Sequence, residues 1–158
     1  MKFRCGRTPS VLVLAPLLLL AGSCGRHKLR PDELAHHRIL AEILRREDAR
    51  LLGDDGFFSV HLSDPGDPQV QEWCAVALGR IGSPRALPWL YGALRERNAA
   101  VRAAAAFAVG EIEDRAILRQ EGRRPDPDAI PSLIRLLDDG SLSVQMRAIE
   151  ALGKAGSE

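Results

Sequence analysis

The strongest constraint on this chain is a helical pattern that occurs three times. Residues 70–82 (VQEWCAVALGRIG), 101–113 (VRAAAAFAVGEIE) and 144–156 (VQMRAIEALGKAG) align with one another at offsets of 31 and 43 residues. In each segment apolar residues recur at the spacing of one helix face. A shorter apolar pattern with an internal proline precedes the second and third segments, at 86–90 and 129–133. The repeating unit is therefore predicted to be a helical hairpin.

Residues that start and stop helices bound these hairpins. A serine or aspartate precedes a proline at 83–84, 67–68 and 126–127, which suits an N-cap followed by the first helical position. Asp139-Gly140 and Pro65-Gly66 are expected to end the helices before them. A hairpin with one apolar face cannot bury that face alone, so such hairpins stack side by side. The predicted fold is all-α, an α-solenoid of stacked helical hairpins spanning 33–156.

The regions around the three segments are assigned from their composition. Residues 34–46 are expected to form an N-terminal helix that covers the end of the stack, and 54–62 to form the first helix of the first hairpin. The larger offset before the third segment places extra residues at about 118–126. This stretch has neither periodicity nor apolar content, so it is predicted to be an exposed loop.

The hairpin pattern resembles HEAT repeats, in particular the short bacterial kind called phycobilisome lyase-type HEAT-like repeats. The residues that carry the resemblance are 83–87 (SPRAL) and 101–112 (VRAAAAFAVGEI). The resemblance implies an extended surface for a protein partner. It does not imply bilin lyase activity, because the export signal described next would separate the chain from cytoplasmic pigments.

Residues 1–23 are predicted to be a signal peptide, since Lys2, Arg4 and Arg7 precede the apolar stretch 11–21. That stretch is shorter than the ~20 residues that cross a bilayer. Residues 20–24 (LAGSC) resemble a bacterial lipobox, which implies a lipidated Cys24 followed by a tether at 24–32. The alternative is ordinary secretion with Cys24 left as a free thiol. The predicted location is the bacterial cell envelope, with the outer membrane slightly favoured because Gly25 follows the cysteine.

Charge and motif content exclude several function classes. The 22 basic and 21 acidic residues give a net charge of +1, which provides no field for binding nucleic acid. No phosphate-binding loop, nucleophile elbow or CxxC pair is present. Adjacent His36 and His37 cannot share one helix face, so no metal site is expected. We therefore expect no catalytic residue, cofactor or small-molecule substrate.

The favoured function is a non-catalytic scaffold for protein interaction, held at a membrane by its lipid anchor. The alternative is the N-terminal repeat region of a larger envelope enzyme, most plausibly a cyclophilin-type peptidyl-prolyl isomerase. Nothing in these 158 residues matches the β-rich cyclophilin barrel, so its catalytic domain would lie outside them.

Three aromatic residues are the predicted partner contacts. Trp73 aligns with Ala104 and Arg147, Trp89 aligns with Ser132, and Tyr91 aligns with Ile134. Positions that take Arg or Ser in a sister repeat are expected to face solvent, and exposed aromatics are frequent interface hot spots. The alternative is that Trp73 packs under the N-terminal helix and Trp89 covers a seam between units.

Two further expectations concern Cys74 and the last repeat. Cys74 aligns with Ala105 and Ala148, so it is expected to be a small buried residue rather than a reactive thiol. The last helix carries Val144 and Ile149, among other apolar residues, and no capping unit follows. Its apolar residues either pack inward, or are covered by another chain, or belong to a longer protein.

Overall fold

A computed structural model describes residues 30–118 and 126–156 of the chain. These residues form seven α-helices and two 3-10 helices, with no strand among them. In chain order the elements are α1 (Pro31–Asp48), α2 (Phe57–Leu62), α3 (Pro68–Ile81), η1 (Pro84–Ala86), α4 (Leu87–Ala93), α5 (Ala99–Leu118), α6 (Ala129–Ile134), η2 (Arg135–Asp138) and α7 (Leu142–Ala155). The predicted all-helical fold is confirmed.

The description below concerns the unit Asp32–Glu158. The predicted signal peptide, Cys24 and most of the predicted loop at 118–126 lie outside the described residues. Within the part that is described, no helix is both long enough and apolar enough to span a bilayer.

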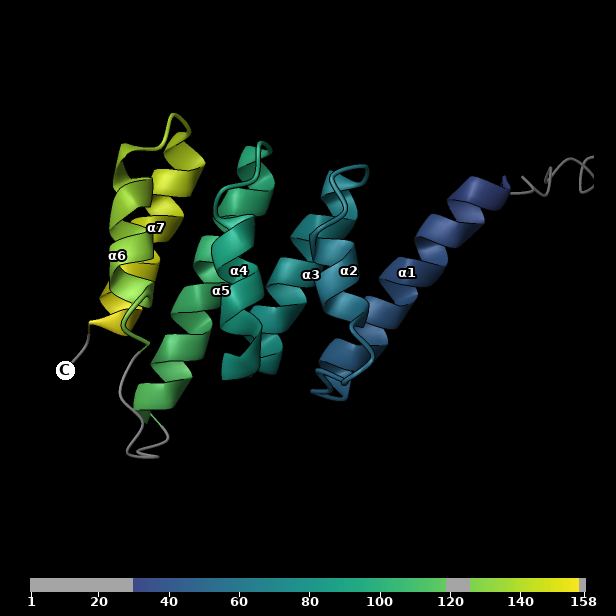
Figure 1. Ribbon diagram of the computed structural model, residues 1–158, viewed down its shortest axis with the longest axis horizontal. Coiled ribbons are helices and arrows are strands. Elements are labelled where there is room, and N and C mark those ends of the chain that lie inside the picture. Colours follow the sequence, from purple (N-terminus) through teal and green to yellow (C-terminus); the bar gives the residue numbers. More distant parts are fainter. Residues whose placement is uncertain (1–29, 119–125, 157–158) are drawn as a thin grey trace, which may run out of the picture. The chain divides into compact units, whose positions relative to one another are not determined.

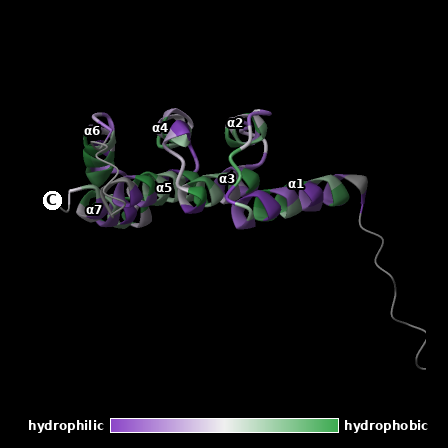
Figure 2. Ribbon diagram, turned by 90° about the horizontal axis from the view of Figure 1, so that it is seen from below, coloured by the Kyte–Doolittle hydropathy of each residue, from purple (hydrophilic) through white to green (hydrophobic). Residues whose placement is uncertain are grey.

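The helices form two layers. Figure 2 shows α1, α3, α5 and α7 side by side in one layer and α2, α4 and α6 in the other. Each short helix pairs with the long helix that follows it, so the hairpins are α2–α3, α4–α5 and α6–α7 (Figure 1). The long helices also pack on one another, α3 on α5 and α5 on α7. This arrangement is an α-solenoid of helical hairpins, as the repeat predicts.

The residues at the two termini of helix α3 explain where the helix begins and ends. The Asp67 carboxylate accepts a hydrogen bond from the Val70 amide at 3.1 Å, and Pro68 occupies the first helical position. Gly82 ends the helix in the left-handed region at φ 73°, a conformation that costs glycine little. The N-cap prediction is wrong at Ser83, whose side chain makes no capping hydrogen bond although its backbone is extended. It is also wrong at Asp126, because α6 begins at Ala129 with Asp128 as its N-cap residue.

The seams between the long helices depend on glycine. A Cβ atom on Gly79 would lie 2.7 Å from the Cα of Ala108, and one on Gly110 would lie 2.8 Å from the Cα of Ala151. Both glycines occupy the same position of the repeat, 31 residues apart. Because glycine has no side chain, the backbones of the neighbouring helices lie closer together here than any other residue would permit.

The core consists mainly of small aliphatic side chains, as the composition of 46% hydrophobic and only 4% aromatic residues indicates. Cys74 is fully buried among them, and burial raises the pKa of its thiol to about 12. This confirms Cys74 as a buried small residue, because a thiol with so high a pKa forms almost no reactive thiolate near neutral pH.

Helix α1 joins the stack differently. Ile43 is its one fully buried apolar residue, Ile39 and Leu40 pack partly buried against the core, and polar contacts add to the attachment. The His36 ring lies 2.7 Å from the Asp67 carboxylate, and Glu47 pairs with Arg80 at 2.7 Å. Burial alone would raise the pKa of Asp67, but hydrogen bonds from Val70 and His36 outweigh it and lower that pKa. The N-terminal helix therefore lies against α3, as predicted.

Candidate partner-binding groove

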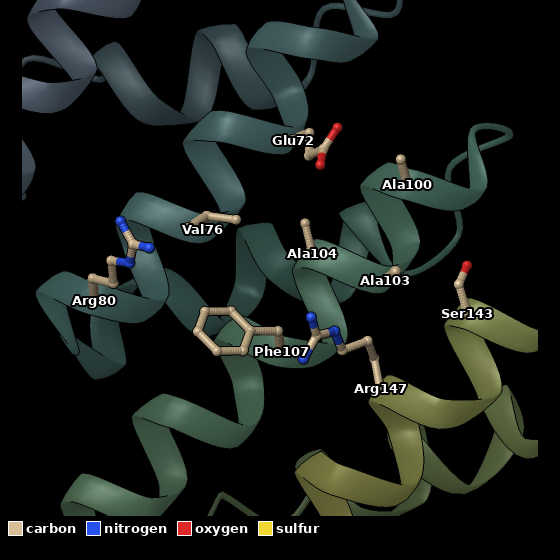
Figure 3. Close-up of a pocket in the computed structure, with 9 residues that line it drawn as sticks. All are labelled: Glu72, Val76, Arg80, Ala100, Ala103, Ala104, Phe107, Ser143 and Arg147. Carbon is tan, nitrogen blue, oxygen red and sulfur yellow. The ribbon is translucent and has the colours of Figure 1, made fainter.

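A groove runs across the layer of long helices and is the best candidate for a binding site (Figure 3). It has a volume of about 480 Å³ and is lined by residues of α3, α5 and α7 only. The lining residues are Glu72, Val76, Arg80, Ala100, Ala103, Ala104, Phe107, Ser143 and Arg147. The short helices contribute nothing to it, so the groove belongs to one layer of the solenoid.

The repeat explains why the groove exists. Ala100, Ala103 and Ala104 line its middle section on α5, where a larger side chain would fill the space between the flanking helices. Ala103 is the sister position of Glu72 and Met146, and Ala104 is the sister position of Trp73 and Arg147. The middle repeat therefore carries small side chains where both neighbours carry large ones, and a hollow between α3 and α7 results.

Phe107 stands in this hollow with two cations beside it. The Arg147 guanidinium lies 5.8 Å from the centre of the Phe107 ring, and the Lys154 ammonium lies 5.4 Å from it. Both distances are within the range of cation–π attraction. Phe107 is half-buried and lines the groove, so part of its side chain is accessible to a ligand.

Neighbouring carboxylates hold these cations in place. Lys154 donates to Glu111 at 2.6 Å, and this hydrogen bond raises the pKa of Lys154. Arg147 donates to Glu150 at 2.7 Å, which lowers the pKa of that carboxyl. The site therefore combines an apolar floor with fixed charges of both signs, a pattern typical of protein recognition.

The three predicted partner contacts do not line this groove. Trp73 lies on α3 with 38% of its side chain exposed, the largest exposure among the three. Trp89 and Tyr91 lie on α4, in the other layer, and both are half-buried against the core. Their role in binding stays a prediction, and the structure does not gather them into one surface.

Tyr91 has a structural contact of its own. Its hydroxyl donates to Asp126 at 2.9 Å, which joins α4 to the turn before α6. Burial, reinforced by the Asp126 carboxylate, raises the pKa of Tyr91 well above its usual value. Buried Glu113 accepts a hydrogen bond from the Asp126 amide at 3.0 Å, so this turn is fixed from α5 as well.

The expectation that Trp89 faces solvent depends on Ser132, its sister residue in the next repeat, being exposed. This premise is wrong. Ser132, the sister residue, is only 7% exposed, and its hydroxyl accepts a hydrogen bond from Arg135 at 3.0 Å. A small polar residue can thus occupy a buried position once a neighbour satisfies it. Serine at a sister position is therefore weaker evidence of exposure than arginine is.

Charged residues on the long helices also form contacts between hairpins. Arg102 makes two hydrogen bonds to the Asp139 carboxylate, both at 2.8 Å, and the two side chains are only 17% and 10% exposed. This pair joins the second and third hairpins and lowers the pKa of Asp139. Asp139 also accepts from the Ser141 amide at 2.9 Å, so the predicted turn carries a link between repeats.

Sequence reasoning missed Phe107, although a signal for it existed. Its sister positions are Val76 and Glu150, and a position that accepts a charged residue is expected to be accessible. The same argument that singled out Trp73 therefore applies to Phe107. As for metals, no cluster of three or more candidate ligands occurs within residues 30–118 and 126–156.

Comparison with known families agrees with this architecture. A family model of HEAT repeats matches residues 58–120, which covers α2 to α5. The match and the stacked hairpins together support a HEAT-like repeat protein, and HEAT repeats suggest a scaffold for protein interaction. None of the curated proteins matches the chain.

Proposed function

We propose that this protein is a scaffold that holds a segment of a protein partner in the groove across α3, α5 and α7. The observation that carries the proposal is the half-buried Phe107 side chain in an alanine-lined hollow, with Arg80 and Arg147 among the lining residues. An aromatic anchor with charged neighbours is the usual energetic centre of a protein interface.

The groove suits a polypeptide segment better than a small metabolite. It extends over three neighbouring long helices, and its two arginines are already paired with carboxylates beside it, Arg147 with Glu150 and Arg80 with Glu47. Small-molecule sites instead enclose their ligand and present a few convergent polar groups. The HEAT repeat match over 58–120 supports the same choice.

Site-specific photocrosslinking tests this proposal. A photoreactive residue at Ser143, on the rim of the groove, is expected to yield a discrete protein adduct in cells. The same residue at Val60 on α2, which is 65% exposed and does not line the groove, serves as the control and is expected to yield none. Phe107→Ala is expected to abolish the Ser143 adduct. Equal adducts at both sites, or an adduct unaffected by Phe107→Ala, would contradict the proposal.

We also propose that Cys24 anchors the chain through a lipid to a membrane of the bacterial cell envelope. The support is the sequence alone, namely the basic and apolar segments of 1–23 followed by LAGSC at 20–24. Two or more acyl chains give stable anchoring, since each buried methylene contributes ~0.8 kcal/mol. Incorporation of radiolabelled palmitate is expected in the wild-type chain and is expected to disappear in Cys24→Ser. Label retained by Cys24→Ser would rule out this anchor.

A further inference from the structure

Glu72 is the unpaired charge of the groove among the described residues. It lies on α3, is half-buried and lines the groove, and its carboxylate makes no hydrogen bond or ion pair with any residue that the structure describes. The two arginines that line the groove differ, because Arg80 pairs with Glu47 and Arg147 pairs with Glu150, both at 2.7 Å. The charge of the lining that remains to be neutralised is therefore the negative charge of Glu72.

The repeat itself does not require a carboxylate at this position. The sister residues of Glu72 are Ala103 and Met146, and both belong to long helices that stack in the same layer. The N-cap residue of α3 is Asp67, so Glu72 does not set the start of the helix either. Figure 3 shows the Glu72 side chain extending from α3 towards the part of the groove that Ala100 lines. The carboxylate is therefore a feature of the groove rather than of the repeat.

A segment bound in the groove removes water from the Glu72 carboxylate. An ionised carboxylate that loses water without gaining a partner is strongly unfavourable. Arg80 and Arg147 cannot neutralise Glu72 without leaving their own carboxylate partners. A lysine or arginine of the bound segment neutralises it directly through a charge-assisted hydrogen bond. The groove therefore discriminates against segments that lack a cation.

The rest of the groove determines what accompanies this cation. Phe107 is half-buried, and Ala100, Ala103 and Ala104 line the same hollow, so an apolar side chain of the segment fits there. An acidic side chain in place of the cation would meet Glu72 as a like charge. The complementary segment is therefore both basic and apolar.

We propose that the partner segment carries a lysine or arginine that pairs with Glu72, next to an apolar side chain that contacts Phe107. This inference rests on the proposed groove function and adds to it the chemistry of the partner, a basic and apolar polypeptide segment. Glu72 is the residue that determines this specificity.

Selection from a phage-displayed library of random short peptides tests the proposal, with the full chain in mild detergent as the bait. Peptides enriched by the wild-type chain are expected to share an apolar residue and a lysine or arginine at a constant spacing. Peptides enriched by Glu72→Gln are expected to keep the apolar residue and to lose the cation. In fluorescence anisotropy, Glu72→Gln is expected to weaken binding of the best wild-type peptide about tenfold. A version of that peptide with glutamine in place of the cation is expected to bind both chains equally.

Glu96→Gln is the matched control, because Glu96 is also a half-buried glutamate but lies outside the groove. It is expected to enrich the same peptides as the wild type, and circular dichroism checks that each variant is folded. Peptides that depend on Phe107 but show no preference for a cation, or that keep this preference with Glu72→Gln, would overturn this inference alone. No enriched peptide, or enriched peptides unaffected by Phe107→Ala, would overturn the groove function and this inference with it.

Discussion

The seams between the hairpins and the attachment of α1 differ in kind. At the seams, Gly79 and Gly110 bring helix backbones into direct contact with Ala108 and Ala151. Helix α1 instead reaches α3 through longer side chains, in the pairs His36–Asp67 and Glu47–Arg80. The seams therefore depend mainly on shape, with the Arg102–Asp139 pair as an added polar link, whereas α1 depends in part on a partly exposed ion pair. Substitutions and salt should affect these two regions differently.

The largest effect is expected at a seam. Ala151 is 1% exposed and lies against Gly110, so Ala151→Leu has no room for its added atoms. Overpacking of this kind is expected to lower the free energy of unfolding by about 3 kcal/mol. Chemical denaturation monitored by circular dichroism measures it. A loss as small as that of an exposed substitution would mean that α5 and α7 are not in close contact.

Removal of the polar link between the second and third hairpins is expected to have the next largest effect. Arg102→Met leaves Asp139, which is 10% exposed, without its partner. The expected loss is about 2 kcal/mol, below the 3–5 kcal/mol typical of fully buried pairs because both side chains keep some contact with water. The double variant Arg102→Met/Asp139→Asn should recover part of this loss. A loss in the double variant equal to the sum of both single losses would show that the two residues do not interact.

The same pair gives a pH dependence. Arg102 lowers the pKa of Asp139 in the folded chain, so its contribution to stability is complete above the ordinary aspartate pKa. The contribution is lost as the pH falls through the lowered pKa of the folded state. Unfolding measured from neutral to acidic pH should therefore be less acid-sensitive in Asp139→Asn than in wild type. Identical pH profiles would contradict this assignment.

The smallest effect concerns α1 and salt. Because the Glu47–Arg80 ion pair is partly exposed, ~1 M salt should screen it and weaken the attachment of α1. Hydrogen exchange should become faster for the α1 amides and stay unchanged for the buried middle of α5. Equal changes in both helices, or no change in α1, would show that charge does not distinguish the two regions.

The sequence predicted the repeating parts of the fold better than the contacts between them. Periodic apolar residues and Asp67-Pro68 placed the hairpins, because helix formation and capping depend on neighbouring residues. The pairing of Arg102 with Asp139 joins residues 37 positions apart, and no local pattern indicates it. The groove escaped prediction for the same reason. Its hollow results from small residues on α5 between larger ones on α3 and α7, which becomes visible only when three helices are side by side.

The central claim is that hairpins stack through direct backbone contact at the repeat glycines, and a pair of alanine substitutions tests it most directly. Helix propensity alone favours alanine over glycine by up to ~1 kcal/mol in a helix. A Cβ on Gly92 of α4 would meet no atom within 4 Å, so Gly92→Ala is expected to leave the free energy of unfolding unchanged or raised. At Gly110 the new Cβ would lie 2.8 Å from the Cα of Ala151. Gly110→Ala is therefore expected to lower the free energy of unfolding by about 1–3 kcal/mol. If Gly110→Ala stabilised the protein as much as Gly92→Ala, the stacking described here would be contradicted.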